Sequence, residues 1–368
     1  MNDAASAAAP VESSKTADAS NALGTEPFVE RRRGTSPTGL DRRRSSGLDG
    51  LRAVACLFVV AFHLHTVSGL SFGPLDLIVR GLDTGVWMFF ALSGYLLYKP
   101  FLTTRVDLVG YAIKRSARIL PGYYVALVCL VILTGSRLPL DNPLPFLALT
   151  APYDISLRGF LGNAWTLSVE ILFYVTLPVV AWAARGREVG VLSGLAVASM
   201  VAAVAHRATL SQPTEWLIGT FPLAYYAFVP GMMLAVLEVK RPDILRGFGS
   251  PAFLLSGIVC LTAGALTSIL PLAIGAAVGT PMLMGWLLQH RLPGARLLTF
   301  AGGASYAMYL WHKDLLIAFG PAGLALVVVG SVLSWAVVER PILARAHWLA
   351  DSWKSRRALE RAALQPAK

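Results

Sequence analysis

Charged side chains are scarce in this sequence, and patterns that bind metal or form disulfides are missing from it. Only 14% of its 368 residues are charged, whereas soluble domains carry about 25%. The three cysteines, Cys56, Cys129 and Cys260, lie far apart in apolar stretches, which excludes a disulfide framework and a zinc motif. Residues 1–48 lack the basic start and apolar core of a secretory signal. A soluble domain and a disulfide scaffold are therefore excluded, and no metal site is expected.

Apolar residues make up most of the chain. Hydrophobic residues account for 55% of it, and the mean hydropathy is +0.60. Because a bilayer core about 30 Å thick needs about 20 helical residues, the apolar windows predict an all-α, polytopic membrane helix bundle with about ten transmembrane helices. The windows fall at residues 51–67, 81–99, 119–135, 164–184, 189–206, 215–237, 251–269, 271–289, 298–318 and 321–339.

Basic residues between the windows predict the orientation. They gather in every second loop between the windows, for example in the loop that contains Arg185 and Arg187. Loops rich in Lys and Arg stay in the cytoplasm. We therefore expect a multi-pass protein of the cell membrane with both termini cytoplasmic, and we attribute the net charge of +11 to membrane loops and lipid contact rather than to nucleic acid. The predicted domains are a disordered cytoplasmic tail (1–48), a membrane domain (49–341) and a basic cytoplasmic tail (342–368).

Arg52 and His63 lie on one predicted helix, about 16 Å apart along its axis. An ionisable group inside a membrane helix is costly to keep there, so its default interpretation is functional. If Arg52 lies at the membrane boundary, His63 lies near the middle of the bilayer. A titratable imidazole at that depth favours chemistry or transport, and a histidine that is hydrogen-bonded between helices is the alternative.

Glu170 is a second ionisable residue within an apolar window, about 12 Å below the outer boundary. A carboxylate at that depth must be paired, hydrogen-bonded or protonated. Trp165 lies near it at helical spacing and belongs either to a site or to an interfacial aromatic belt. Tyr306, in a later window, is an aromatic residue with a polar tip inside the membrane.

Two other segments suggest ligand contacts. Ser93 and Gly94 in the middle of a window allow close approach of a ligand or of another helix. Lys114, Arg115 and Arg118 share one face of a helix and would bind phosphates, although ordinary anchoring by positive loops is the alternative. The later run His312, Lys313 and Asp314 is expected to be an exposed polar cap near the outer boundary.

A series of these segments, taken in order, resembles acyltransferase family 3, the integral membrane O-acyltransferases. The resemblance extends from about residue 49 to residue 341, which is nearly all of the membrane part. The matching segments are LDGLRAVACLFVVAFHLH, FFALSGYLL, KRSARILPGYY, NAWTLSVEILFY and SYAMYLWH, followed by VVERP.

The resemblance implies transfer of an acyl group, usually acetyl, from cytoplasmic acyl-CoA to a hydroxyl of a cell-surface carbohydrate, a glycolipid or a secondary metabolite. It implies that His63 is the essential histidine and Arg52 its partner, with Glu170 as a third catalytic candidate. The remaining candidates divide into two groups. The cofactor-binding group is Lys114, Arg115, Arg118, Ser93 and Gly94, and the substrate-binding group is Trp165 and Tyr306.

A neutral imidazole can remove the proton of a hydroxyl as its oxygen attacks a thioester, which is worth a factor of about 10² to 10⁴. Ser93 and Tyr306 are candidate donors to the resulting oxyanion. The alternative function is a transporter or flippase of a glycolipid or anionic substrate. A sensor or structural protein would explain the apolar bulk of the chain but not Arg52, His63 and Glu170 together.

Overall fold

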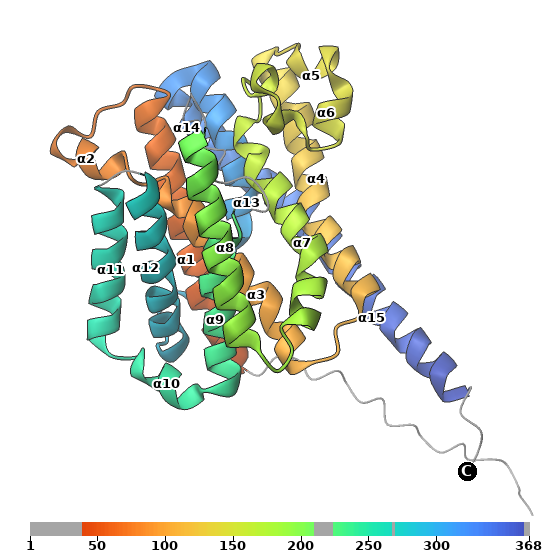
Figure 1. Ribbon diagram of the computed structural model, residues 1–368. Coiled ribbons are helices and arrows are strands. Elements are labelled where there is room, and N and C mark those ends of the chain that lie inside the picture. Colours follow the sequence, from red (N-terminus) through yellow and green to blue (C-terminus); the bar gives the residue numbers. More distant parts are fainter. Residues whose placement is uncertain (1–38, 210–223, 267–268, 364–368) are drawn as a thin grey trace, which may run out of the picture. The chain divides into compact units, whose positions relative to one another are not determined.

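The computed structural model describes residues 39–209, 224–266 and 269–363. Most of these residues are helical, and none of them forms a strand (Figure 1), which confirms the predicted all-α class. The predicted tail up to residue 38 and the last part of the basic tail, from residue 364, lie outside the described residues. The chain divides into two units after Thr38, and the description below concerns the second unit, which starts at Gly39.

Long helices make up most of this unit, and a helix lies in every predicted apolar window, although residues 215–223 lie outside the described ranges. The long helices are α1 (Gly39–Thr66), α3 (Thr84–Thr103), α4 (Leu108–Thr134), α7 (Trp165–Ala183), α8 (Glu188–Thr209), α9 (Tyr225–Lys240), α11 (Pro251–Ala265), α12 (Ile269–Gln289), α13 (Ala295–Phe319), α14 (Gly323–Leu333) and α15 (Arg340–Ala363). The short helices are α2 (Asp76–Val79), α5 (Leu138–Asp141), α6 (Pro143–Leu147), α10 (Pro242–Gly247), η1 (Gly73–Leu75), η2 (Ala151–Tyr153), η3 (Ile155–Leu157), η4 (Gly162–Ala164), η6 (Gly320–Ala322) and the π-helix η7 (Ser334–Glu339).

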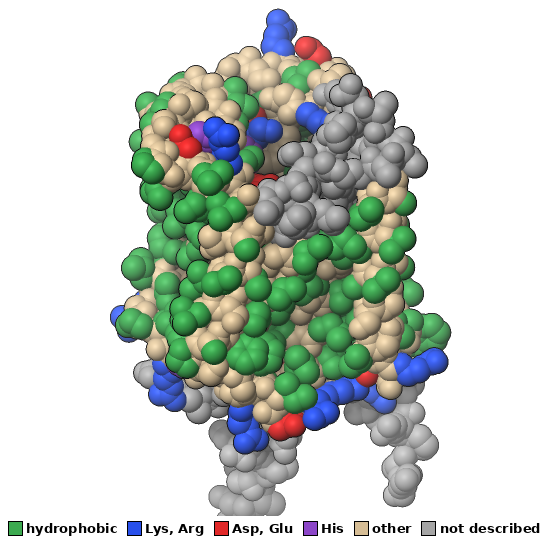
Figure 2. All heavy atoms as spheres, turned by 60° about the vertical axis from the view of Figure 1, so that its left-hand side comes forward, with side chains coloured by type: hydrophobic (Ala, Val, Ile, Leu, Met, Phe, Trp, Pro, Cys, Tyr) green, Lys and Arg blue, Asp and Glu red, His purple; other side chains and the backbone are tan. Residues whose placement is uncertain are grey.

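Five stretches of the described residues are long and apolar enough to cross a membrane. They are Ser46–Thr66, Leu108–Thr134, Gly162–Ala183, Glu188–His206 and Ala295–Arg357. Hydrophobic side chains cover a broad band of the surface, and many of the charged side chains gather at its two ends (Figure 2). The count of about ten crossings and the cytoplasmic termini stay predictions. Helix α1 begins at Gly39, upstream of the predicted domain start at residue 49.

The centre of the bundle contains the pairs α1–α13 and α3–α9, with α1 also packed on α3. Glycine makes the α3–α9 crossing close. A Cβ placed on Gly94 of α3 would lie 2.1 Å from the backbone oxygen of Phe228, and one on Gly231 of α9 would lie 1.7 Å from that of Ala91. Real Cβ atoms cannot approach an oxygen so closely, so backbone contact between the two helices requires glycine at both positions. Gly94 is therefore explained by helix packing.

Residues 136–163, between α4 and α7, form several short helical turns that we call the cap segment. The Tyr123 hydroxyl donates to the Phe146 carbonyl at 2.7 Å, which ties the segment to α4. Leu161 adopts a left-handed backbone conformation (φ 48°), and its N–H donates to the Asp314 carboxylate at 3.0 Å. Asp314 is only 4% exposed. The expectation that it belongs to an exposed polar cap was wrong, because the carboxylate is needed to bind this backbone turn.

Candidate active site

Side chains from five helices meet in a polar pocket of about 100 Å³. Arg52 comes from α1, Ser93 from α3, Arg115 and Arg118 from α4, Glu170 from α7 and Tyr306 from α13. We call it the arginine pocket, since three guanidinium groups line it together with one carboxylate. Residues that the sequence places far apart are thus brought together.

Aromatic rings hold two of the arginines. The guanidinium of Arg115 lies 5.9 Å from the ring centres of both Tyr111 and Tyr174, and that of Arg118 lies 5.3 Å from the ring centre of Tyr306. Such cation–π contacts orient a guanidinium without neutralising it. The buried Nε of Arg115 has no hydrogen-bond partner among the described residues. An anion that entered the pocket would find a donor already in place.

Three carboxylates lie near the arginines and differ in their contacts with them. The Ser93 hydroxyl donates to Glu170 Oε1 at 2.7 Å. Arg52 pairs with Asp49 at 3.5 Å, and Arg118 Nη1 lies 3.9 Å from Oε2 of Glu339. The hydroxyl of Ser93 is therefore engaged. That of Tyr306 is engaged as well, because it donates to the backbone oxygen of residue 119 at 2.7 Å.

His63 lies in a second pocket of about 270 Å³, which we call the histidine pocket. It is also lined by Trp165 and by several residues of the cap segment, including Asn163. Val86 and Tyr309 line both pockets, so the two cavities adjoin at these side chains. The structure thus separates His63 and Trp165 from the arginines and Glu170.

A second histidine contacts His63. His312 is completely buried, and its Nε2 lies 3.1 Å from His63 Nδ1. The Nδ1 atom of His312 lies 2.8 Å from the carbonyl oxygen of Tyr309. Because a carbonyl oxygen only accepts hydrogen bonds, we assign the proton of neutral His312 to Nδ1, which leaves Nε2 as an acceptor.

The same reasoning assigns the proton of His63. Its Nδ1 lies 3.0 Å from the Val59 carbonyl oxygen and also faces the acceptor Nε2 of His312. Two acceptors around one nitrogen require an N–H there, so the Nε2 of neutral His63 carries the lone pair. Within the described part of the chain, no hydrogen bond engages this Nε2. An unengaged imidazole nitrogen in a cavity can accept a proton.

His312 was missed by the sequence analysis, which expected an exposed polar cap there. The correction has a physical reason: the last turns of α13 lie under the cap segment, so the imidazole is enclosed. A His-Lys-Asp run near the end of an apolar helix does not show that the cap segment covers it. The only signal in the sequence was a second histidine close to a predicted membrane boundary.

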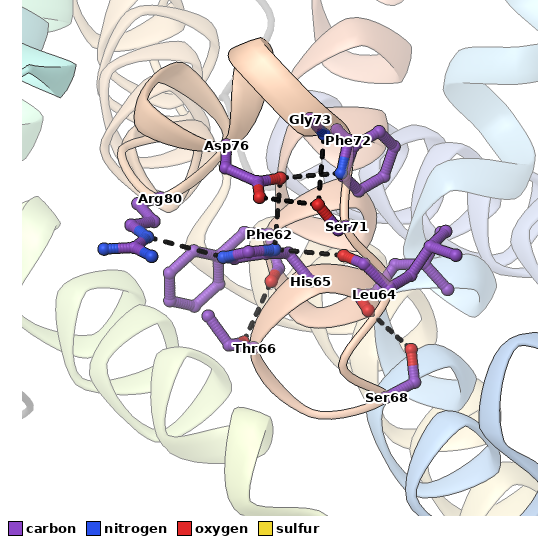
Figure 3. Close-up of polar contacts among 11 residues, drawn as sticks. Phe62, Leu64, His65, Thr66, Ser68, Ser71, Phe72, Gly73, Asp76 and Arg80 are labelled. Atoms are coloured by element: carbon purple, nitrogen blue, oxygen red, sulfur yellow. Dashed lines mark hydrogen bonds and ion pairs between the residues drawn. The ribbon is translucent and has the colours of Figure 1, made fainter.

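The end of α1 is held by a polar network in the following loop (Figure 3). Asp76 accepts a hydrogen bond from the Phe72 N–H at 2.6 Å, and this bond lowers the pKa of the Asp76 carboxyl. His65 accepts from Arg80 Nε at 3.4 Å and lies 3.5 Å from Asp76. The network fixes the last turn of α1, which also presents Phe62 to the histidine pocket.

Two of the predicted cofactor-binding residues lie outside both pockets. Lys114 forms an ion pair with Asp351 of α15 at 3.1 Å, and Gly94 lies at the α3–α9 crossing. Neither residue lines the arginine pocket. Lys114 therefore joins two helices, because its position on α4 faces α15 rather than the bundle interior.

Comparison with known proteins identifies the family. A family described as "Acyltransferase domain" matches residues 45–339. The chain is 27% identical to the exopolysaccharide production protein ExoZ of Rhizobium meliloti, over 72% of this chain and 90% of that protein. It is 28% identical to Nodulation protein 10 of Rhizobium leguminosarum bv. viciae, over 70% of this chain and 82% of that protein.

A third similarity covers less of either protein. Peptidoglycan O-acetyltransferase OatA of Listeria monocytogenes is 30% identical over 38% of this chain and 25% of its own length. No solved structure matches the chain. The family match spans the helices that form both pockets, and it confirms the resemblance seen in the sequence motifs: the chain belongs to this acyltransferase family and is an acyltransferase.

Proposed function

We propose that this protein is a membrane O-acyltransferase that moves an acyl group, in the first place acetyl, from acyl-CoA to a hydroxyl of a carbohydrate, a glycolipid or a small secondary metabolite. The observation that carries the proposal is the pair of adjoining pockets. One has three arginines, and the other has an imidazole whose Nε2 is not engaged by any described residue. Relatives named for exopolysaccharide production and for peptidoglycan O-acetylation support a carbohydrate acceptor.

The arginine pocket would hold the phosphates of the acyl donor. Guanidinium groups present several N–H donors in a planar fork that suits phosphate oxygens. Arg115 offers a buried Nε that has no hydrogen-bond partner in the described part of the chain. Arg118 Nη1 lies 3.9 Å from Oε2 of Glu339, which is longer than a hydrogen bond. The acyl end of the donor would then extend to Tyr309 and Val86, where the two pockets adjoin.

His63 would act as the general base from the adjoining histidine pocket. Its Nε2 takes the proton of the acceptor hydroxyl while the hydroxyl oxygen forms a bond to the thioester carbonyl carbon. The tetrahedral intermediate then collapses as the carbon–sulfur bond breaks. The imidazolium returns its proton to the sulfur, so that an ester and free CoA thiol leave.

His312 is the positioning residue in this scheme. Its Nε2 accepts from the Nδ1–H of His63 both before and after proton uptake, which keeps the ring in one orientation. In this scheme Glu170 and Arg52, which were expected among the catalytic residues, would serve the donor instead, because both line the arginine pocket. We assign them to the donor: Arg52 adds positive charge, and Glu170 holds Ser93 and partly balances the arginines.

We further propose a multi-pass arrangement with the donor entering from the cytoplasm. Arg52 lies in the first half of α1 and His63 in its last turn, so the arginine pocket would lie nearer the cytoplasmic end of that helix. The acceptor would reach the histidine pocket from the outer side.

Radiolabelled acetyl-CoA distinguishes this proposal from a transporter. Membranes that contain the full chain are incubated with the label on the acetyl group, beside membranes without it, and glycan, lipid and small-molecule fractions are counted. We expect label in a product of one fraction together with release of free CoA. Uptake into sealed vesicles without transfer of label to a product would contradict the proposal.

A further inference from the structure

Two cationic side chains line the histidine pocket together with His63. Arg158 belongs to the cap segment, and Lys313 follows His312 on α13. The Nε of Arg158 donates to the Pro152 carbonyl at 2.9 Å, which fixes its guanidinium on the pocket wall. One carboxylate, Asp83, also lines the pocket. The cavity therefore has two cations and one anion beside a neutral imidazole.

Lys313 is half-buried and forms no ion pair with any described residue. The nearby carboxylate of Asp314 is used by the backbone N–H of Leu161. A Cβ placed on Gly162 would lie 3.1 Å from Lys313 Nζ, so the ammonium group lies against the backbone of the cap segment. Partial burial of an ammonium group that has no ion pair among the described residues is unfavourable, and an anionic ligand would relieve that cost.

Asn163 adds a buried acceptor to the pocket. The residue is 4% exposed, and its amide nitrogen donates to the Tyr309 carbonyl. Its Oδ1 has no hydrogen-bond partner among the described residues. Buried polar atoms are normally paired, so this oxygen is suited to a hydroxyl group of a bound ligand.

Two indole rings complete the walls. Trp87 and Trp165 both line the pocket, and their ring centres lie 6.0 and 6.1 Å from that of Phe90. The common contact with Phe90 holds both rings in place. Rigid aromatic faces with a few directed polar groups are typical of small-ligand sites, and the C–H faces of a sugar ring pack well on indole.

On the basis of the proposed function, we infer that the acceptor is an anionic sugar, with a carboxylate or phosphate close to the hydroxyl that is acylated. Arg158 and Lys313 would bind the anion and Asn163 a neighbouring hydroxyl, while the reacting hydroxyl faces His63. Figure 2 shows Lys and Arg side chains around a hollow at one end of the molecule. A neutral sugar would leave the ammonium group of Lys313 without an ion pair among the described residues.

Equilibrium dialysis of the full chain in detergent tests this inference without any acyl transfer. The probes are methyl β-glucuronide, glucose 6-phosphate and the neutral methyl β-glucoside. We expect at least one anionic probe to bind about tenfold more tightly than the glucoside, as for a charge-assisted hydrogen bond. Tighter binding of the glucuronide indicates an acidic sugar as the acceptor, and tighter binding of the phosphate indicates a phosphorylated glycan.

The variants Arg158→Gln and Lys313→Gln should each reduce this preference, and the double variant should abolish it. Arg241→Gln is the matched control, because Arg241 is exposed and pairs with the exposed Asp243. Equal binding of all three probes, or a preference that persists in the double variant, would overturn the inference. Acetyl transfer in membranes is measured in parallel: transfer without an anion preference refutes only this inference, and a preference without transfer refutes only the proposed function.

Discussion

The two ring nitrogens of His63 have different partners, and this difference determines the chemistry available at the residue scale. Nδ1 is surrounded by the acceptors Val59 O and His312 Nε2, whereas Nε2 has no such partner in the described ranges. A base needs an accessible lone pair and a fixed orientation. The pair His63–His312 supplies both, because the buried ring of His312 orients the ring of His63, which lines the cavity.

Substitution of His312 tests this pairing. Gln at position 312 can offer its side-chain oxygen where Nε2 lies, whereas Asn is too short to reach His63. We expect His312→Asn to lower kcat about tenfold or more, within the factor of about 10² to 10⁴ that a general base supplies. His312→Gln should recover part of this loss, and KM for acetyl-CoA should be unchanged in both. Equal losses of kcat in the two variants would show that His312 has only a packing role.

Arg115 tests the donor site at the same scale. Its guanidinium lies 5.9 Å from each of two tyrosine ring centres, and its buried Nε has no hydrogen-bond partner among the residues that the structure describes. We expect Arg115→Ala to raise KM for acetyl-CoA about 10- to 100-fold, since hydrogen bonds to charged groups contribute about 1.5–3 kcal/mol. Arg115→Lys should restore little, because an ammonium lacks the planar fork. Steady-state kinetics with Arg241→Ala as the exposed control measures this, and an unchanged KM would refute the assignment.

At the scale of elements, the α3–α9 crossing positions one wall of the arginine pocket. Ser93 lines that pocket, and its neighbour Gly94 touches the backbone of α9. Any side chain at position 94 would push the two helices apart and displace the serine. The two neighbouring residues thus have different roles: Ser93 faces the cavity, and Gly94 allows α9 to pack closely.

Gly94→Ala should therefore destabilise the protein by about 1–3 kcal/mol, the usual cost of overpacking. Gly190→Ala on α8 is the matched control, because a Cβ there meets nothing within 4 Å. The control should be neutral or slightly stabilising, since alanine favours helix over glycine by about 0.5–1 kcal/mol. Thermal unfolding in detergent compares them, and equal melting temperatures for the two variants would contradict the described crossing.

At the scale of the whole molecule, hydropathy predicted the helices well, because a membrane span needs a long apolar run whatever its neighbours are. Ionisable residues such as Arg52 and Glu170 were identified from the sequence because a charged residue is rare within a long apolar run. The division into two pockets was not predictable. A linear pattern gives the depth of a residue along its own helix, but it does not show which neighbouring helix the side chain faces. For this reason Lys114 was assigned to the donor, and the burial of His312 was missed.

The central claim is that an acyl group passes from a donor held in the arginine pocket to a hydroxyl activated in the adjoining histidine pocket. Because His63 lies outside the arginine pocket, its removal should affect transfer and leave donor binding intact. The most direct measurement compares acetyl-CoA binding and acetyl transfer in membranes for His63→Ala and for the exposed control His347→Ala. We predict normal binding in both and a loss of transfer by a factor of about 10² to 10⁴ only in His63→Ala. Transfer at the wild-type rate by His63→Ala would contradict the account.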